Sequence, residues 1–205
     1  MQLLFATSNP HKIEEVAAIL KPLDIDVVGL DSLDKQLTEP VEDGKTFEAN
    51  AKIKAVYYAK AIGRMCLADD SGLEVNALGG KPGVYSARYA GVDGSRAEAD
   101  QANNVKLLDE LKDVPQEDRS ARFICAMCLV DSDCRVVAET RGTFEGVIVD
   151  QPRGRNGFGY DPLLYLPDVD CTSAQLSSEQ KNARSHRGIA ARQIAQYVSE
   201  LGIQL

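Results

Sequence analysis

The sequence predicts an α/β protein, because short apolar runs typical of buried strands alternate with segments of helical periodicity. The first run, 2–6, precedes apolar residues at helical spacing over 13–20. A second run, 65–68, ends at two consecutive aspartates, and two β-rich runs lie between 122 and 149. This alternation predicts a sheet with helices packed against it.

Length and composition fit one compact domain over 1–205, since 44% of the 205 residues are apolar and 26% are charged. The β-rich texture of 122–150 indicates a second lobe within it. The net charge of −8 argues against nucleic acid and anionic membranes as partners, because both need a contiguous positive surface. No run approaches the roughly 18 apolar residues of a spanning helix, and no signal-peptide pattern is visible. We therefore expect a cytoplasmic protein.

Five cysteines, an odd number, favour reduced thiols over a disulfide framework. Cys125 and Cys128 have the spacing of a redox or zinc pair, but they lie in a run expected to be a strand. Residues three apart on a strand point to opposite faces. Since no second Cys or His pair completes a zinc site, we expect these thiols to be structural.

The first expected strand leads into the loop Thr7-Ser8-Asn9-Pro10-His11-Lys12 and then into a helix. Asn9 is a favourable N-cap, and Pro10 suits the first helical turn. A helix start presents backbone N–H groups and a positive dipole end, so this loop could hold phosphate, with Lys12 adding a charge. Capping alone is the alternative. The loop is not a Walker loop, since it lacks the glycines and the Gly-Lys-Ser/Thr ending.

The remaining elements follow from periodicity and turn residues. Helices are expected over 47–62, with Lys54 on a flank, over 96–111, and from 185 onward; strands are expected on both sides of a hairpin loop at 131–134 and again at 163–166. The inward side chains of the last helix are expected to be Ile189, Ile194, Tyr197, Val198 and Leu201.

Asp69 and Asp70 are expected at the carboxyl end of a strand, where α/β sheets bind ligands. Carboxylates beside phosphate-holding groups can carry a hard divalent cation and activate a water. A solvated turn is the alternative, because Asp, Ser and Gly are frequent turn formers. The same two interpretations apply to Glu42-Asp43-Gly44.

Two later segments carry groups suited to a planar ligand. Gly157-Phe158-Gly159-Tyr160-Asp161-Pro162 could offer an aromatic platform, or it could be a tight turn with both rings in the core. Ser185-His186-Arg187-Gly188, with Lys181 one turn upstream, gathers basic groups at a helix start, where they oppose the dipole. An anionic or carbonyl-bearing ligand would explain these basic groups.

Taken in order, these segments resemble the inosine/xanthosine triphosphate pyrophosphatase family. Its members hydrolyse deaminated purine nucleoside triphosphates to the monophosphate and pyrophosphate. The likeness extends from the first strand to the last helix. It is carried by Thr7-x-Asn9-x-x-Lys12-x-x-Glu15, Glu48-Ala49-Asn50-Ala51 with Lys54, Asp69-Asp70-Ser71-Gly72, the run 82–89, Phe158-Gly159-Tyr160-Asp161 and Ser185-His186-Arg187-Gly188.

The resemblance implies an elongated central mixed sheet flanked by helices, two lobes with an active-site cleft between them, a homodimer and a requirement for Mg²⁺. It implies that Asp70 is the general base and a metal ligand, with Asp69 its competitor. Many members carry two consecutive acids before a Thr/Asn-Gly step, whereas this chain has Val41-Glu42-Asp43-Gly44, and we expect Glu42 to be the second metal ligand. The substrate contacts implied are Thr7 to Lys12 and Lys54 for the triphosphate, Ser71, and, around the base, Phe158, Gly159, Tyr160, Asp161, Lys181, His186 and Arg187.

The expected reaction is therefore hydrolysis of ITP, dITP and XTP, which keeps these nucleotides out of DNA and RNA. Two alternatives stay open. A pyrophosphatase for modified pyrimidine nucleotides would differ in its substrate profile. A noncatalytic nucleotide sensor would bind triphosphates and release no pyrophosphate, although paired acids beside a phosphate loop disfavour it, because they repel a ligand without metal.

Overall fold

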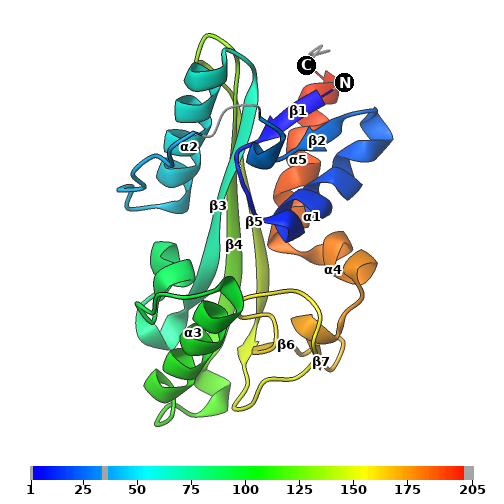
Figure 1. Cartoon of the computed structure of the whole chain (residues 1–205). Helices are drawn as coiled ribbons and strands as arrows, with labels where there is room; N and C mark the ends of the chain where they lie inside the picture. The colour runs from blue at the N-terminus through cyan, green and yellow to red at the C-terminus, as the bar shows by residue number, and fades with distance from the viewer. Residues whose placement is uncertain (1, 34–36, 201–205) are drawn as a thin grey trace. The chain divides into compact units, whose positions relative to one another are not determined.

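The computed structural model describes residues 2–33 and 37–200. Within them, seven strands form one mixed sheet in the order β2-β1-β3-β4-β5-β6-β7 (Figure 1). β1 pairs in parallel with β2 and β3, whereas β6 pairs antiparallel with β5 and β7. The predicted α/β class is confirmed. The strands are β1 Gln2–Phe5, β2 Asp26–Val28, β3 Cys66–Val75, β4 Ser120–Val130, β5 Val136–Ile148, β6 Leu164–Leu166 and β7 Cys171–Thr172.

The helices expected from periodicity are present to within a residue or two. None of the described helices is long and apolar enough to cross a membrane. One helix was not predicted, α4, whose seven residues are too few to show a periodic pattern; it begins at a Ser177–Gln180 capping box. The helices are α1 Pro10–Leu20, α2 Phe47–Ile62, α3 Arg96–Glu110, α4 Ser178–Arg184 and α5 His186–Glu200.

The buried side of α5 differs in part from the prediction. Ile194 and Val198 are buried as expected, but Tyr197 is 45% exposed. The buried stripe follows Arg187, Ala190, Ala191, Ile194 and Val198, which leaves Tyr197 at its edge. Leu201, also expected to face inward, lies outside the described residues.

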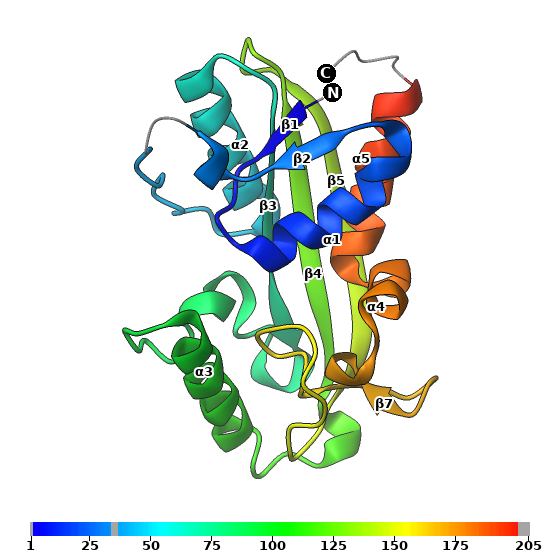
Figure 2. The same ribbon diagram turned by 45° about the vertical axis from the view of Figure 1, so that its right-hand side comes forward.

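The chain divides into two compact units. The first holds residues up to Asp70, Cys125–Gly142 and the segment from His186 on. In it, α1 and α5 lie side by side (Figures 1 and 2). Both helices cover strands of the sheet, and their apolar side chains share one core. This core includes Leu3, Phe5, Val16, Leu20, Leu67, Met127, Leu129 and Ile194.

The second unit holds Ser71–Ile124 and Thr143–Ser185. Its own core includes Leu107 of α3, the α3 C-cap Leu111, Phe144 and Ile148 of β5, and Tyr160. The span 122–150, expected to be a second lobe, is divided between the units: 125–142 belongs to the first, and the residues on either side belong to the second.

The position of the two aspartates differs from the prediction. A strand end after Ala68 was expected, but β3 runs on to Val75, so both acids lie inside it and are buried. The expectation was wrong because the turn-forming residues are held by tertiary contacts. A Cβ at Gly72 would lie 2.4 Å from Ser86 Oγ, and this hydroxyl accepts a hydrogen bond from the Leu73 N–H at 2.8 Å. The acids still follow the carboxyl end of β1, whose Phe5 pairs with Leu67.

Candidate active site

The loop before α1 has the predicted cap. The Asn9 side chain accepts a hydrogen bond from the His11 N–H at 3.1 Å, and Thr7 Oγ1 accepts one from the Asn9 N–H at 3.1 Å. Pro10 occupies the first helical turn. Ser8, Pro10 and His11 are exposed, so the outer side of the loop is open. The loop thus presents a helix start and its dipole to solvent, as an anion site requires.

Asp69 lies in a buried ion-pair network. Its carboxylate is 2.9 Å from Lys12 Nζ and 3.2 Å from Arg187 Nη2, while Arg187 Nη1 donates to Glu15 at 2.6 Å. Asp69 and Arg187 are each 1% exposed. Burial alone would raise the pKa of Asp69, but Lys12, Arg187 and Lys54 hold it well below its usual range. Asp69 is therefore permanently ionised and already paired, which makes it a poor candidate for the base.

Asp70 has a different environment, on the opposite face of β3. Its Oδ2 accepts a hydrogen bond from Asn50 Nδ2 at 3.0 Å, and Lys54 Nζ is 3.4 Å from its Oδ1. Burial raises the pKa of Asp70, and the nearby Lys54 charge and the Asn50 hydrogen bond only partly offset this effect. Asp70 is consequently more basic than an ordinary aspartate, as a proton acceptor should be.

Glu42 meets Asp70 at a shared ammonium group. Lys54 Nζ is 2.8 Å from Glu42 Oε2 and 3.4 Å from Asp70 Oδ1. Burial alone would lower the pKa of Lys54, but the charges of Asp70, Asp69 and Glu42 outweigh it and raise the pKa above the ordinary value. The Lys54 ammonium therefore stays protonated between the two carboxylates.

Glu42 and Asp70 fit a magnesium ion by their chemistry. Mg²⁺ prefers oxygen ligands and is usually held by one or two carboxylates together with substrate phosphates and water. Among the described residues, no group of three or more His, Cys, Asp or Glu side chains gathers into an all-protein metal site. Two carboxylates that share the Lys54 ammonium match this partial ligand set.

The glycine-rich loop at 157–161 is organised by Asp161. This carboxylate is 2% exposed and accepts hydrogen bonds from the Phe158 N–H at 2.9 Å, Lys181 Nζ at 2.7 Å and Ser173 Oγ at 2.8 Å. Lys181 Nζ also lies 5.0 Å from the centre of the Phe158 ring. Gly157 is required here, because its φ is +75° and a Cβ would lie 2.0 Å from Asp161 Oδ2.

The two aromatic residues of this loop have different positions. Tyr160 is buried in the core, and its hydroxyl donates to the Ser86 carbonyl at 2.8 Å. This matches the alternative interpretation of a core ring rather than a platform. Phe158 is only half-buried and remains the candidate for stacking on a base.

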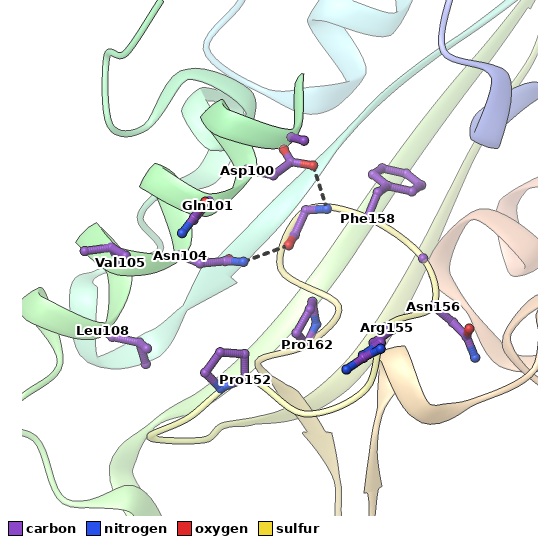
Figure 3. A pocket seen from close by; sticks show the side chains of 13 residues that line it. Asp100, Gln101, Asn104, Val105, Leu108, Pro152, Arg155, Asn156, Phe158 and Pro162 are labelled. Atoms are coloured by element: carbon purple, nitrogen blue, oxygen red, sulfur yellow. Dashed lines mark hydrogen bonds between the residues drawn. The ribbon is translucent and has the colours of Figure 1, made fainter. Parts of the chain in front are cut away.

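A pocket of about 460 Å³ lies beside this loop, between α3 and residues 152–162 (Figure 3). From α3, Asp100 Oδ2 accepts a hydrogen bond from the Gly159 N–H at 2.9 Å, and Asn104 Nδ2 donates to the Gly159 carbonyl at 3.0 Å (Figure 3). Both backbone groups of Gly159 are thus held by one helix.

A family model described as the Ham1 family matches residues 3–197. The chain belongs to the Ham1 family. Two relatives are named dITP/XTP pyrophosphatase: that of Desulforamulus reducens is 45% identical over 203 residues, 99% of this chain and 98% of its own, and that of Bacillus subtilis is 45% identical over 195 residues, 95% of each chain. A Ham1 protein structure from Coxiella burnetii has a TM-score of 0.86, 38% identity and coverage of 98% and 99%. The resemblance predicted from sequence is confirmed.

In this Ham1 family member the predicted site residues form two groups. The first unit brings together Lys54, Asp70 and Glu42, and it also contains the loop 7–12, His186 and Arg187. The second unit holds Ser71 and brings Phe158–Asp161 together with Lys181. Arg187, predicted to contact the base, directs its guanidinium to Asp69 and Glu15, which favours a role in holding Asp69; its contact with the base stays a prediction.

Sequence reasoning did not assign a role to Asn50, Asp100 or Asn104. Asn50 gave a signal: it lies three residues after Phe47, on the apolar stripe of a helix in which its neighbours are alanines. A buried amide at such a position needs hydrogen-bond partners. No sequence signal marked Asp100 and Asn104, because polar residues are common on a half-exposed helix.

Proposed function

We propose that this protein hydrolyses the deaminated purine nucleotides ITP, dITP and XTP to the monophosphate and pyrophosphate, which prevents their incorporation into DNA and RNA. The observation that carries the proposal is the placement of Asp70, a buried carboxylate with a raised pKa, beside Lys54 and Glu42. The names of the relatives support the substrate class.

In the proposed reaction, Asp70 orients a water and accepts its proton while the water oxygen attacks the α-phosphorus. The bond from the α-phosphorus to the bridging oxygen breaks, and pyrophosphate leaves with the bonding electrons. In this proposal Lys12, Lys54 and the N–H groups at the start of α1 stabilise the leaving pyrophosphate; their positive character supports this role. Positioning and electrostatic stabilisation supply most of the rate in this chemistry.

We propose Asp70 and Glu42 as the residues that hold Mg²⁺. The bound ion would neutralise charge on the phosphate oxygens. Lys54 keeps the two carboxylates close together, since its ammonium contacts both.

Selectivity for the base is assigned to the loop at 157–161 and Lys181. The Lys181 ammonium is a hydrogen-bond donor for the 6-oxo group of hypoxanthine or xanthine, and Phe158 offers a ring face for stacking. Adenine presents an amino group at this position, so its N–H groups would oppose the donor. Sites that require one hydrogen-bonding group reject analogues by roughly 10⁴ to 10⁵.

A homodimer in the cytoplasm completes the proposal. All five cysteines are free thiols, as suits a reducing compartment. The net charge of −8 supports a small nucleotide rather than a nucleic acid as the ligand, because only local positive groups are available.

Pyrophosphate release from dITP, XTP, dATP, dGTP and dTTP, with magnesium and with chelator, tests the function. We expect metal-dependent release from dITP and XTP. Asp70→Asn should lower it by about 10²- to 10⁴-fold, the usual contribution of a general base, with little change in folding, because the side chains have the same shape. Asp133→Asn, in the exposed hairpin loop, is the matched control.

A near-normal rate for Asp70→Asn would contradict the assignment of the base. Preference for dTTP would favour the pyrimidine alternative, and nucleotide binding without pyrophosphate release would favour the sensor.

A further inference from the structure

Asn50 is a buried amide whose two ends are both hydrogen-bonded. It lies in the first turn of α2 and is 1% exposed. Its Nδ2 donates to Asp70 Oδ2 at 3.0 Å, and its Oδ1 accepts from the Gly44 N–H at 2.9 Å. A backbone N–H can only donate, so the amide oxygen must face Gly44 and the NH₂ group must face Asp70. Its orientation is therefore fixed by the chain itself.

The contact between Asn50 and Gly44 leaves no room for a side chain at residue 44. A Cβ at Gly44 would lie 2.5 Å from Asn50 Oδ1 and 2.9 Å from the Ala49 Cβ. Gly44 follows Glu42 by two residues, so this contact and the Glu42–Lys54 ion pair both tie the acidic segment to α2. Asn50 is thus bonded at one end to Asp70 and at the other to the segment that carries Glu42.

We propose that Asn50 is a positioning residue for the hydrolysis, which fixes the Asp70 carboxylate and the Glu42 segment in one relative placement. The proposal rests on the proposed function and on Glu42 and Asp70 as the magnesium ligands. Asn50 contacts neither the phosphorus nor the base in this role; it acts through the two carboxylates.

The need for such a residue follows from carboxylate geometry. The terminal torsion of an aspartate is broad, so the carboxylate turns easily unless each oxygen has a partner. Lys54 contacts Oδ1 of Asp70 at 3.4 Å, a long distance, and Asn50 takes Oδ2 at 3.0 Å. Without Asn50, the carboxylate would turn about the long Lys54 contact, and the Gly44 N–H would lose its hydrogen bond to α2.

The test compares Asn50→Ala with Asn103→Ala as a matched control. Asn103 is also a buried amide, 2% exposed, but it bonds only backbone groups: the Ala90 N–H and the Ser86 and Ala87 carbonyls. Both variants lose a buried amide with its hydrogen bonds, so both should lower the unfolding temperature. Only Asn50→Ala should change the response to magnesium.

Four quantities are measured on the full chain: kcat and KM for dITP at saturating Mg²⁺, the Mg²⁺ concentration for half-maximal rate, and the Kd for Mg²⁺ binding to the substrate-free protein by calorimetry. For Asn50→Ala we expect the half-maximal Mg²⁺ concentration and the calorimetric Kd to rise about 10- to 100-fold, as for other residues that orient metal ligands. We expect kcat to fall while the KM for dITP stays within about twofold, because the groups that bind phosphate are intact.

Gly44→Ala is a second variant that removes no polar group. It should push the acidic segment away from Asn50 and produce the same change in the magnesium response, so the proposal stays testable if Asn50→Ala fails to fold. Unchanged magnesium response in the folded variants would overturn the proposal, as would an equal change in Asn103→Ala. If the wild type releases no pyrophosphate, the proposed function fails, and the calorimetric comparison still decides whether Asn50 positions the carboxylates.

Discussion

Asp69 and Asp70 are neighbours on β3, so their side chains point to opposite faces of the sheet. On one face, Asp69 meets Lys12 of α1 and Arg187 of α5. On the other, Asp70 meets Asn50 and Lys54 of α2. Their pKa values are shifted in opposite directions: burial raises that of Asp70, whereas strong cationic pairing lowers that of Asp69. Two identical residues thus acquire different chemistry from their partners.

The role assigned to Asp69 predicts how stability depends on pH. Because the folded pKa of Asp69 is below its unfolded value of about 3.9, its contribution is complete above that value and is lost as pH falls from there through the folded pKa. Asp69→Asn should lower the free energy of unfolding near neutral pH by about 3–5 kcal/mol, because Lys12 and Arg187 lose a buried partner. Urea unfolding of both proteins between about pH 7 and pH 3 measures this.

The wild type should lose stability more steeply than the variant below about pH 4, since only the wild type must protonate a paired Asp69. Parallel stability curves would mean that Asp69 is not held ionised by the network. Asp133→Asn, which changes an exposed aspartate, is the control and should reproduce the wild-type curve.

Among the secondary-structure elements, sequence periodicity predicted the long amphipathic helices. α1, α2, α3 and α5 were found because three or more turns give a readable apolar stripe. Strand β2, strand β7 and helix α4 have three, two and seven residues, too few for a pattern. The prediction ended β3 too early because Asp-Asp-Ser-Gly has the composition of a turn. In the structure, tertiary contacts keep this segment extended.

The site was predictable to the extent that residue chemistry and family resemblance locate it. The cap at Asn9, the meeting of Glu42, Lys54 and Asp70, and the Asp161–Lys181 pair all agree with the expected grouping. What sequence could not supply is the partner of each side chain. Arg187 pairs with Asp69 and Glu15 through contacts between residues more than a hundred positions apart, which no local pattern encodes.

The contact between α3 and the loop at 157–161 gives a prediction for an element. Asp100 and Asn104 hold both backbone groups of Gly159, next to Phe158 (Figure 3). Asp100→Ala combined with Asn104→Ala removes two hydrogen bonds, each worth about 0.5–1.5 kcal/mol. The freed loop should raise the KM for dITP by roughly 10-fold or more while kcat changes little, because Asp70 is not affected.

Steady-state kinetics with dITP checks this prediction. Gln101→Ala is the control, since Gln101 lies on the same helix and borders the same pocket but makes no bond to Gly159. A fall in kcat at constant KM would contradict it, because it would place the loop in the chemical step rather than in substrate binding.

The net charge of the whole chain differs in sign from the charge of the few cationic side chains near the candidate site. The chain carries 31 acidic and 23 basic residues, yet the substrate proposed for it is a polyphosphate. Attraction must come from the few cations near the site. Lys12 and Lys54 are already neutralised in part by Asp69, Asp70 and Glu42, so we expect the charge of the proposed Mg²⁺ to turn this region from acidic to anion-binding.

We expect two copies of this chain to associate as a homodimer. The second unit exposes large apolar side chains: Tyr85 is 60%, Val92 52% and Val105 63% exposed. Exposed apolar groups of this kind mark interfaces when they form a continuous patch, and a stable interface buries roughly 800 Å² on each partner. The proposed homodimer predicts that sedimentation velocity gives twice the 22.2 kDa of one chain. An apolar interface should persist in about 1 M salt, where charge interactions are screened within roughly 3 Å. A mass of one chain at all concentrations would contradict the homodimer, and a dimer that dissociates in salt would place charged rather than apolar side chains at its centre.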